Sequence, residues 1–182
     1  MKKIKGNKFS DLQHLLSIEE IDITLIKDIF KSADKFLKNN QSIEKYKILQ
    51  GKTVCNLFFE NSTRTQTTFE IAAKRLSADV INLDIATSSQ SKGESIIDLI
   101  NNLIAMGVNI FVVRHSKPGV PEQIARNIKN KAHIINAGDG NRGHPTQALL
   151  DAYTIKSYKK SFDDLKVAIV GDIEHSRVAK SE

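Results

Sequence analysis

Hydroxyl side chains surround a guanidinium in the run Ser62-Thr63-Arg64-Thr65. The run follows an apolar segment that ends at Phe59 and precedes a segment with helical periodicity. The first turn of a helix has unpaired N–H groups and a partial positive charge, and both favour a bound phosphate. The hydroxyl groups add hydrogen bonds, and the arginine adds a fork of donors that matches phosphate oxygens. The run therefore predicts an anion site, with a simple N-cap role for Ser62 as the alternative.

Other candidate ligands lie near the ends of further predicted elements. Arg114 ends an apolar strand, where a guanidinium requires either an anionic ligand or a structural carboxylate partner, and the sequence does not decide between them. Lys92 lies in a Ser-rich segment whose composition on its own indicates only a solvated loop. His144 precedes the first turn of a predicted helix, with Gln147 one turn along. Without further context, such a histidine is an ordinary surface or capping residue.

One glycine-rich segment imitates a dinucleotide-binding fingerprint. Residues 138–143 satisfy G-x-G-x-x-G after a predicted strand, and Asp163 or Asp164 lies about 20 residues further on. In the fingerprint, the helix begins within the glycine run. Here Pro145 is the natural first helical residue, which leaves the glycines in a loop. The segment therefore argues against nicotinamide binding and favours backbone that passes close to a substrate.

Strand-like and helix-like segments alternate, which is typical of an α/β fold with a parallel sheet flanked by helices. Ligands of such sheets bind at the loops that follow the carboxyl ends of the strands. We expect strands over residues 53–59, 80–84, 109–114, 133–137 and 166–171. We expect helices over residues 22–37, 65–76, 94–106 and 145–159, and a further helix that opens at Pro121.

The composition is that of a folded globular protein. Of the 182 residues, 40% are hydrophobic and 26% are charged, so a packed core is feasible. The single cysteine, Cys55, excludes a disulfide framework and a multi-thiolate zinc site, and its place within an apolar run predicts a buried structural thiol. No apolar run reaches the roughly 20 residues that span a bilayer, and none follows the basic N-terminus. We therefore expect a cytoplasmic protein that does not bind membranes.

The net charge of +6 is divided evenly between residues 1–50 and residues 51–182. A nucleic-acid interface normally gathers its positive charge on one stripe, often with aromatic residues between the charges. Aromatic residues make up 6% of this chain and tryptophan is absent. We therefore expect no nucleic-acid partner.

Four motifs together resemble the catalytic chains of the aspartate carbamoyltransferase family, within the aspartate/ornithine carbamoyltransferase superfamily. They occur in the order of that family and across nearly the whole sequence. The motifs are Phe58-Phe59-Glu60-Asn61-Ser62-Thr63-Arg64-Thr65, Ser91-Lys92-Gly93-Glu94-Ser95, Arg114-His115, and His144-Pro145-Thr146-Gln147 with Leu149-Leu150-Asp151.

The resemblance implies roles for these residues. It implies catalytic residues at Arg64, Thr65, Arg114 and His144. The same resemblance implies carbamoyl-phosphate ligands at Ser62, Thr63, Arg64, Thr65, Arg114, His144 and Gln147. In this family a loop reaches into the active site of the neighbouring subunit, and Ser88 and Lys92 match its phosphate-contacting positions. Lys92 and Arg177 match positions that bind aspartate.

The implied reaction transfers the carbamoyl group of carbamoyl phosphate to the amino group of L-aspartate. The products are N-carbamoyl-L-aspartate and phosphate, on the route to pyrimidines. The resemblance implies no metal and no organic cofactor. It implies a homotrimer with shared active sites, with regulatory chains as optional partners. Two alternatives stay open: an ornithine carbamoyltransferase, which the segment around Lys92 and the dicarboxylate-matching Arg177 disfavour, and a truncated, non-catalytic paralogue that binds phosphate or partner subunits.

The motifs also suggest how the chain is divided. We expect residues 1–145 to form the carbamoyl-phosphate-binding domain, and residues 146–182 to form a connecting helix and the start of an incomplete second α/β domain. The residues after Lys159 are too few to bury a core of their own. The sequence therefore predicts a C-terminally truncated transferase chain that is inactive or poorly stable alone.

Overall fold

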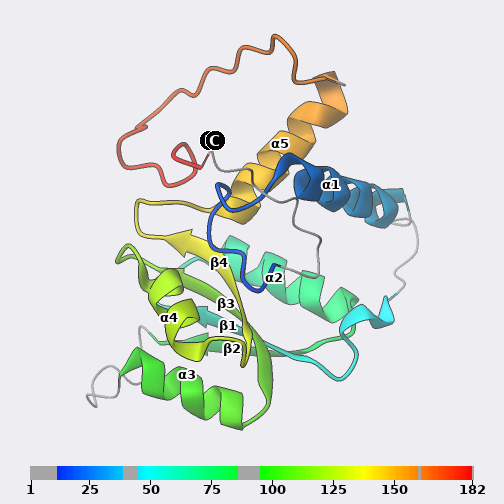
Figure 1. Cartoon of the computed structure of the whole chain (residues 1–182). Coiled ribbons are helices and arrows are strands. Elements are labelled where there is room, and N and C mark those ends of the chain that lie inside the picture. Colours follow the sequence, from blue (N-terminus) through cyan, green and yellow to red (C-terminus); the bar gives the residue numbers. More distant parts are fainter. Residues whose placement is uncertain (1–11, 39–44, 86–94, 160, 182) are drawn as a thin grey trace.

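The computed structural model describes residues 12–38, 45–85, 95–159 and 161–181. Within these ranges the chain forms a four-stranded, fully parallel sheet with helices on both faces (Figure 1). The strands lie in the order β2-β1-β3-β4. Their bounds are Thr53–Phe58 for β1, Asp79–Asp84 for β2, Val108–His115 for β3 and His133–Asp139 for β4.

Five α-helices accompany the sheet in the described ranges. The helices α3 and α4 cover one face, and α2 covers the other (Figure 1). Helix α1 packs against α5 through a small apolar cluster that contains Leu25, Phe30 and Leu149. None of these helices is both long and apolar enough to cross a membrane. The bounds are Ile23–Lys38 for α1, Thr63–Arg75 for α2, Ile96–Ala105 for α3, Val120–Ile128 for α4 and Pro145–Lys159 for α5, with a 3-10 turn over Lys47–Leu49.

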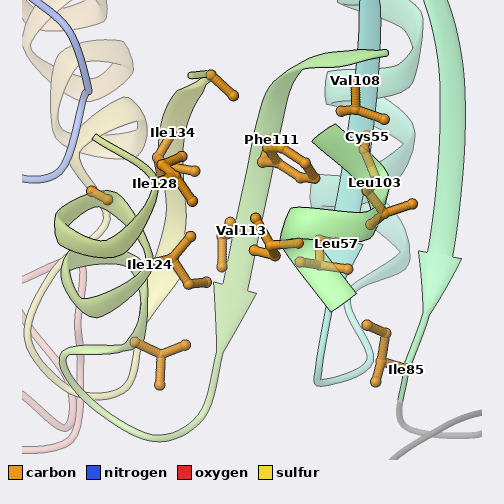
Figure 2. Close-up of a cluster of buried hydrophobic side chains, with 14 residues drawn as sticks. Cys55, Leu57, Ile85, Leu103, Val108, Phe111, Val113, Ile124, Ile128 and Ile134 are labelled. Carbon is orange, nitrogen blue, oxygen red and sulfur yellow. The ribbon is translucent and has the colours of Figure 1, made fainter. Parts of the chain in front are cut away.

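Alternate side chains of the strands fill two separate cores. Leu57, Phe111 and Ile134 are fully buried on the face that α3 and α4 cover (Figure 2). Val54 and Val112 face α2 on the other side. A parallel sheet that is covered on both faces needs such near-continuous apolar strands, and this is why the sequence pattern is so clear over β1 and β3.

Cys55 belongs to the first of these cores and is fully buried. Burial raises the pKa of its thiol to about 12. A thiol with such a pKa carries almost no thiolate near neutral pH, so it is a poor nucleophile. The prediction of a buried structural thiol is confirmed.

The strand order creates a switch point. From β1 the chain crosses to β2 on one side, and then returns to β3 and β4 on the other side. The connections that leave the carboxyl ends of β1 and β3 therefore diverge, and ligands of open parallel sheets bind in the crevice that this leaves.

Backbone groups on the outer edge of β4 have hydrogen-bond partners. Leu15 forms an isolated parallel bridge with Ile135. The Leu15 N–H donates to the Ile134 carbonyl at 2.8 Å, and the Asn136 N–H donates to the Leu15 carbonyl at 2.9 Å. A short extended segment around Leu15 thus continues the hydrogen bonding of the sheet beyond its last strand.

Four of the five predicted strands and all five predicted helices are confirmed, with ends that shift by one or two residues. Helix α1 begins after Asp22, whose Oδ1 accepts a hydrogen bond from the Leu25 N–H at 2.7 Å, as expected of an N-cap. Helix α2 begins at Thr63 rather than at Thr65. Helix α2 turns Ala72 to solvent and buries Ala73.

The strand predicted over residues 166–171 is wrong. The structure has no regular element there, and the Val167, Ile169 and Val170 side chains are exposed. A strand needs a neighbour to satisfy its backbone N–H and C=O groups. Among the described residues no strand lies beside this segment. The described chain after this segment is a series of turns through Ser181.

Candidate functional site

A cavity of about 600 Å³ opens where β1 and β3 end. It collects every predicted site residue that the structure describes: Ser62, Thr63, Arg64, Thr65, Arg114, His144, Gln147 and Arg177. The other lining residues are Asn61, His175, Ser176 and Val178. Ser88 and Lys92, predicted for a neighbouring subunit's loop, lie outside the described residues.

The first turn of α2 forms one wall of this cavity. Ser62 occupies the N-cap position, as the alternative interpretation required, but its side chain makes no capping hydrogen bond. Thr63 and Arg64 follow with exposed side chains, and Thr65 is partly buried. The positive end of the helix and a guanidinium therefore face the same space, which is the arrangement that favours an oxyanion.

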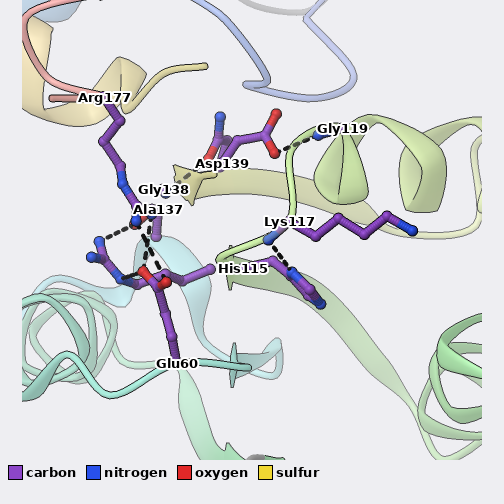
Figure 3. A network of polar contacts seen from close by, with 10 residues as sticks. Glu60, His115, Lys117, Gly119, Ala137, Gly138, Asp139 and Arg177 are labelled. Atoms are coloured by element: carbon purple, nitrogen blue, oxygen red, sulfur yellow. Dashed lines mark hydrogen bonds and ion pairs between the residues drawn. The ribbon is translucent and has the colours of Figure 1, made fainter. Parts of the chain in front are cut away.

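Two arginines share one carboxylate beside this wall (Figure 3). Glu60 follows β1, and its Oε1 lies 2.7 Å from Arg114 Nε and 3.0 Å from Arg177 Nη1. Arg114 Nη1 also donates to the Ala137 carbonyl at 2.9 Å. Burial lowers the pKa of the Arg114 guanidinium, Arg177 lowers it further, and Glu60 offsets part of the change. Arg114 thus has a structural carboxylate partner and also lines the cavity, so the two interpretations of this residue are compatible.

Gly138 makes this approach of two guanidiniums possible. Its φ is +131°, in the region that favours glycine. A Cβ at this position would lie 2.6 Å from Arg177 Nη1 and 2.8 Å from Arg114 Nη1. The glycine run therefore brings backbone close to the charged centre of the site. As predicted, α5 begins at Pro145, after the last of these glycines.

His144 is almost fully buried at the start of α5. Burial lowers the pKa of its imidazole to about 4, and the charges of Arg114 and Arg177 contribute to the shift. The ring is therefore neutral near neutral pH. Its Nδ1 lies 3.1 Å from the Thr146 hydroxyl. One turn on, the Gln147 amide Nε2 donates to Asp151 Oδ1 at 3.0 Å.

Sequence reasoning missed two residues of this site. Glu60 carries no assigned role in the sequence, although a carboxylate directly before an arginine-containing anion site is a signal for an ion pair. Its partners lie 54 and 117 residues away, and no local pattern connects them. His175 also lines the cavity, with its Nδ1 2.9 Å from Asp172 Oδ2. Among the described residues, no three His, Cys, Asp or Glu side chains are placed to hold a metal ion.

Residues 13–157 match the model of the carbamoyl-phosphate-binding domain of aspartate/ornithine carbamoyltransferases. The chain belongs to this family. The match includes α1 to α4, the whole sheet and α5 up to residue 157. It also includes Ser62–Thr65, Arg114, His144 and Gln147, whereas Arg177 lies beyond it.

Solved structures of aspartate transcarbamoylase from Trypanosoma cruzi resemble the chain throughout. The complex of that enzyme with carbamoyl aspartate and phosphate has 33% sequence identity and a TM-score of 0.86 over 93% of this chain and 52% of its own. Its complex with carbamoyl phosphate has 31% identity and a TM-score of 0.87, over 98% and 58%. Its complex with N-(phosphonacetyl)-L-aspartic acid has 33% identity and a TM-score of 0.83, over 91% and 50%. The present chain thus spans about half the length of the structures it matches.

Proposed function

We propose that this chain supplies the carbamoyl-phosphate-binding half of an aspartate carbamoyltransferase. The observation that carries the proposal is the cavity at the switch point of the sheet, which brings together the eight described site residues from four separate segments. The Trypanosoma cruzi enzyme, which shares this fold at about one-third identity, binds carbamoyl phosphate and aspartate. The reaction is the transfer of the carbamoyl group to the amino group of L-aspartate, with release of phosphate.

The wall at α2 suits the phosphate group. Ser62–Thr65 offer hydroxyls, backbone N–H groups at a helix start and the Arg64 guanidinium. Arg114 approaches from β3. As phosphate leaves, its charge grows, and donors that are already in place stabilise that charge without reorganising. Positioning and charge stabilisation are sufficient for this chemistry, and no protein nucleophile is required.

The carbonyl oxygen of the carbamoyl group gains negative charge when the amine attacks. Thr65, Arg114 and His144 line the cavity where donors to that oxygen are needed. When Thr146 donates to His144 Nδ1, the neutral ring keeps its proton on Nε2, which is then a donor to the substrate. One such donor typically contributes about 2.7–4 kcal/mol in comparable acyl-transfer sites. Gln147, one turn further along α5, also lines the cavity and would contact the carbamoyl amide.

Aspartate fits the cavity better than ornithine does. The site carries the positive charges of Arg64, Arg114 and Arg177. Among the described residues, Glu60 is the carboxylate that forms ion pairs with Arg114 and Arg177. Arg177 can bind a second carboxylate, whereas a second amino group would meet repulsion. The remaining aspartate ligands would come from Lys92 and from the half of the enzyme that this chain does not span.

Further parts of the proposal concern assembly and context. The chain would act as a homotrimer in which Ser88 and Lys92 complete the site of a neighbour, in the cytoplasm and in pyrimidine biosynthesis. Residues 1–145 would form the first domain, with α5 as the connection to the second. The proposed carbamoyl-phosphate ligands lie in the first domain and at the start of α5, all within this chain, so carbamoyl-phosphate binding is the part of the proposal that this chain can test directly.

The test is isothermal titration of the chain with carbamoyl phosphate, with N-(phosphonacetyl)-L-aspartate and with its ornithine counterpart. We expect carbamoyl phosphate to bind, and the aspartate analogue to bind more tightly than the ornithine analogue. Tighter binding of the ornithine analogue would favour the ornithine branch. If none of the three ligands binds, the proposal is refuted, because a chain that supplies this half of the site must bind carbamoyl phosphate in its folded state.

The Arg64→Ala variant locates the phosphate contact. A hydrogen bond to a charged group contributes about 1.5–3 kcal/mol, so carbamoyl phosphate should bind at least tenfold more weakly. The side chain is exposed, and the melting temperature should not change. Arg126→Ala is the matched control, because Arg126 is an exposed arginine whose partner is Glu122, outside the cavity. Equal affinity in the two variants would show that Arg64 does not bind phosphate.

A further inference from the structure

A chain of side-chain amides runs from the middle of the sheet to helix α2. Asn56 is fully buried at the centre of β1, and Asn82 lies directly beside it in the register of β2. The Asn56 Nδ2 donates to Asn82 Oδ1 at 2.8 Å. The Asn82 Nδ2 in turn donates to Glu70 Oε2 at 2.8 Å, and Glu70 belongs to α2. Two strands and one helix are thus joined by consecutive hydrogen bonds.

The apolar contacts that hold helix α2 on the sheet are few, and the other directional contact lies at its far end, where the Tyr46 N–H donates to the Arg75 carbonyl at 2.7 Å. Its contribution to the core beneath it is Ala73, which is buried, and Phe69, which is partly buried. Ile71 and Ala72 are exposed. Apolar contact is non-directional, so a narrow apolar stripe tolerates sliding and rolling of a helix. Hydrogen bonds depend steeply on distance and angle, and the amide chain supplies that directional constraint.

The buried end of the chain has a stability cost. Asn56 Oδ1 has no hydrogen-bond partner among the described residues, although it is shielded from solvent. A buried acceptor without a partner is unfavourable. The neighbouring strand positions Val54 and Phe58, which face the same helix, are apolar. A valine at position 56 would therefore suit the strand better, and stability alone does not explain the asparagine.

The helix connects this contact to the candidate site. Glu70 lies seven residues after Thr63, which corresponds to about two turns or about 10 Å along the axis. Ser62 makes no side-chain capping bond. A shift of the helix along its axis would therefore move Ser62–Thr65 relative to Arg114, which is fixed on β3. We propose that Asn82 and Glu70, supported by Asn56, are positioning residues that set the register of α2 and thereby place its anion-binding turn. This inference rests on the proposed function of that turn.

The chain offers a matched control for the test. Lys74 Nζ lies 2.5 Å from Glu70 Oε1, which is the other oxygen of the same carboxylate. This ion pair lies on the exposed side of α2 and does not reach the sheet. Lys74→Ala removes a partner of Glu70 without touching the contact to Asn82. Glu70→Gln keeps an acceptor oxygen for Asn82, whereas Glu70→Ala removes it.

The experiment measures the dissociation constant of inorganic phosphate and the melting temperature for the wild-type chain and each variant. We expect Asn82→Ala and Glu70→Ala to weaken phosphate binding at least fivefold, and Lys74→Ala and Glu70→Gln to stay within twofold. Asn56→Val should weaken phosphate binding while the melting temperature stays equal or rises, which a purely structural role does not produce. Unchanged phosphate affinity in both Asn82→Ala and Glu70→Ala would overturn the inference.

Amide hydrogen exchange separates this inference from the proposed function. If wild-type chain does not bind phosphate, the proposed role of the turn fails, but the register of α2 is still measurable. Faster exchange of the hydrogen-bonded α2 amides from Gln66 onward, whose N–H donates to the Ser62 carbonyl, in Asn82→Ala than in Lys74→Ala would support the positioning role. Equal exchange in the two variants would refute it.

Discussion

The cavity has two walls that differ in how they are held. One wall stands at the carboxyl ends of β1 and β3, strands whose Leu57 and Phe111 side chains are fully buried. The other wall consists of residues 175–178, in a segment of turns without regular structure. The part of the first wall that the strands carry, including Arg114 on β3, is therefore fixed by packing, and α2 is held against it by Ala73, Phe69 and the hydrogen bond between Asn82 and Glu70. The second is held by the contacts of Arg177 with Glu60, and by the Ser181 hydroxyl, which accepts a hydrogen bond from the His144 N–H at 2.7 Å.

This difference indicates which parts of the site have a fixed geometry before a ligand binds. Packed apolar contacts are numerous and depend little on salt or pH. Ion pairs near a surface are few, and salt screens them. The phosphate side should thus keep its geometry in the isolated chain, whereas the side that carries Arg177 depends on electrostatic conditions.

The largest expected effect comes from a substitution of Gly138, which lies against Arg114 of the first wall and Arg177 of the second. Gly138→Ala adds a Cβ at a φ of +131° and within 2.8 Å of both guanidiniums. Strain and overpacking together should lower the free energy of unfolding by about 4 kcal/mol. Gly107→Ala is the control, because its φ is +99° but nothing lies within 4 Å of the added Cβ. Chemical denaturation checks this, and an equal loss in both variants would show that the arginine contact is unimportant.

The second-largest expected effect is a loss of folding stability at low pH. The pKa of His144 is lowered to about 4 from its ordinary value of 6.5, so the unfolded chain takes up this proton at a higher pH than the folded chain does. The stability is therefore fully present above about pH 6.5 and is lost as the pH falls toward 4, by about 3 kcal/mol from this group. Denaturation of wild-type protein and His144→Asn across this range measures the slope. A slope that the substitution does not reduce would contradict the assignment.

A smaller effect is expected at the contact between the walls. Glu60→Gln removes the charge that Arg114 and Arg177 share, and should lower the free energy of unfolding by about 2 kcal/mol. Hydrogen exchange should quicken in residues 172–181 but not in β3. Glu122→Gln is the control, since its pairs with Arg126 and Arg142 are exposed and contribute little. Exchange that quickens equally in β3 would mean that the two walls are not held independently.

The smallest effect compares one valine from each region. Val170 is 94% exposed in the segment that leads to the second wall, and Val113 is fully buried behind the first. Val170→Ala should change stability by less than about 0.5 kcal/mol. Val113→Ala should cost about 2 kcal/mol, because it removes buried methyl groups and leaves a cavity. A substantial loss from Val170→Ala would show that this segment packs in solution.

The framework of the fold was predictable because its signals are local. The apolar runs of β1 and β3 follow from burial on both faces, and Pro145 marks the first residue of α5. The loops at strand ends followed from the topology of parallel sheets. The site residues were found because their motifs resemble a family, while their meeting in one cavity depends on the strand order.

The failures have a common cause in contacts between distant segments. The apolar run at residues 166–171 has strand composition, but pairing requires a neighbouring strand, which composition does not reveal. The charge at Glu60 acquires its role only when β3 and the segment around Arg177 come together.

The short segment around Leu15 has a consequence for self-association. Unpaired strand edges are templates for aggregation, and Leu15 occupies backbone groups on the outer side of β4 through its bonds with Ile134 and Asn136. The opposite edge, β2, has no such cover among the described residues, but it begins with the exposed and charged Asp79. One border of the sheet is thus protected by an added piece of chain and the other by charge. A shortened protein that lacks Leu15 would lose the first protection, and its β4 would become free to recruit strands from other molecules.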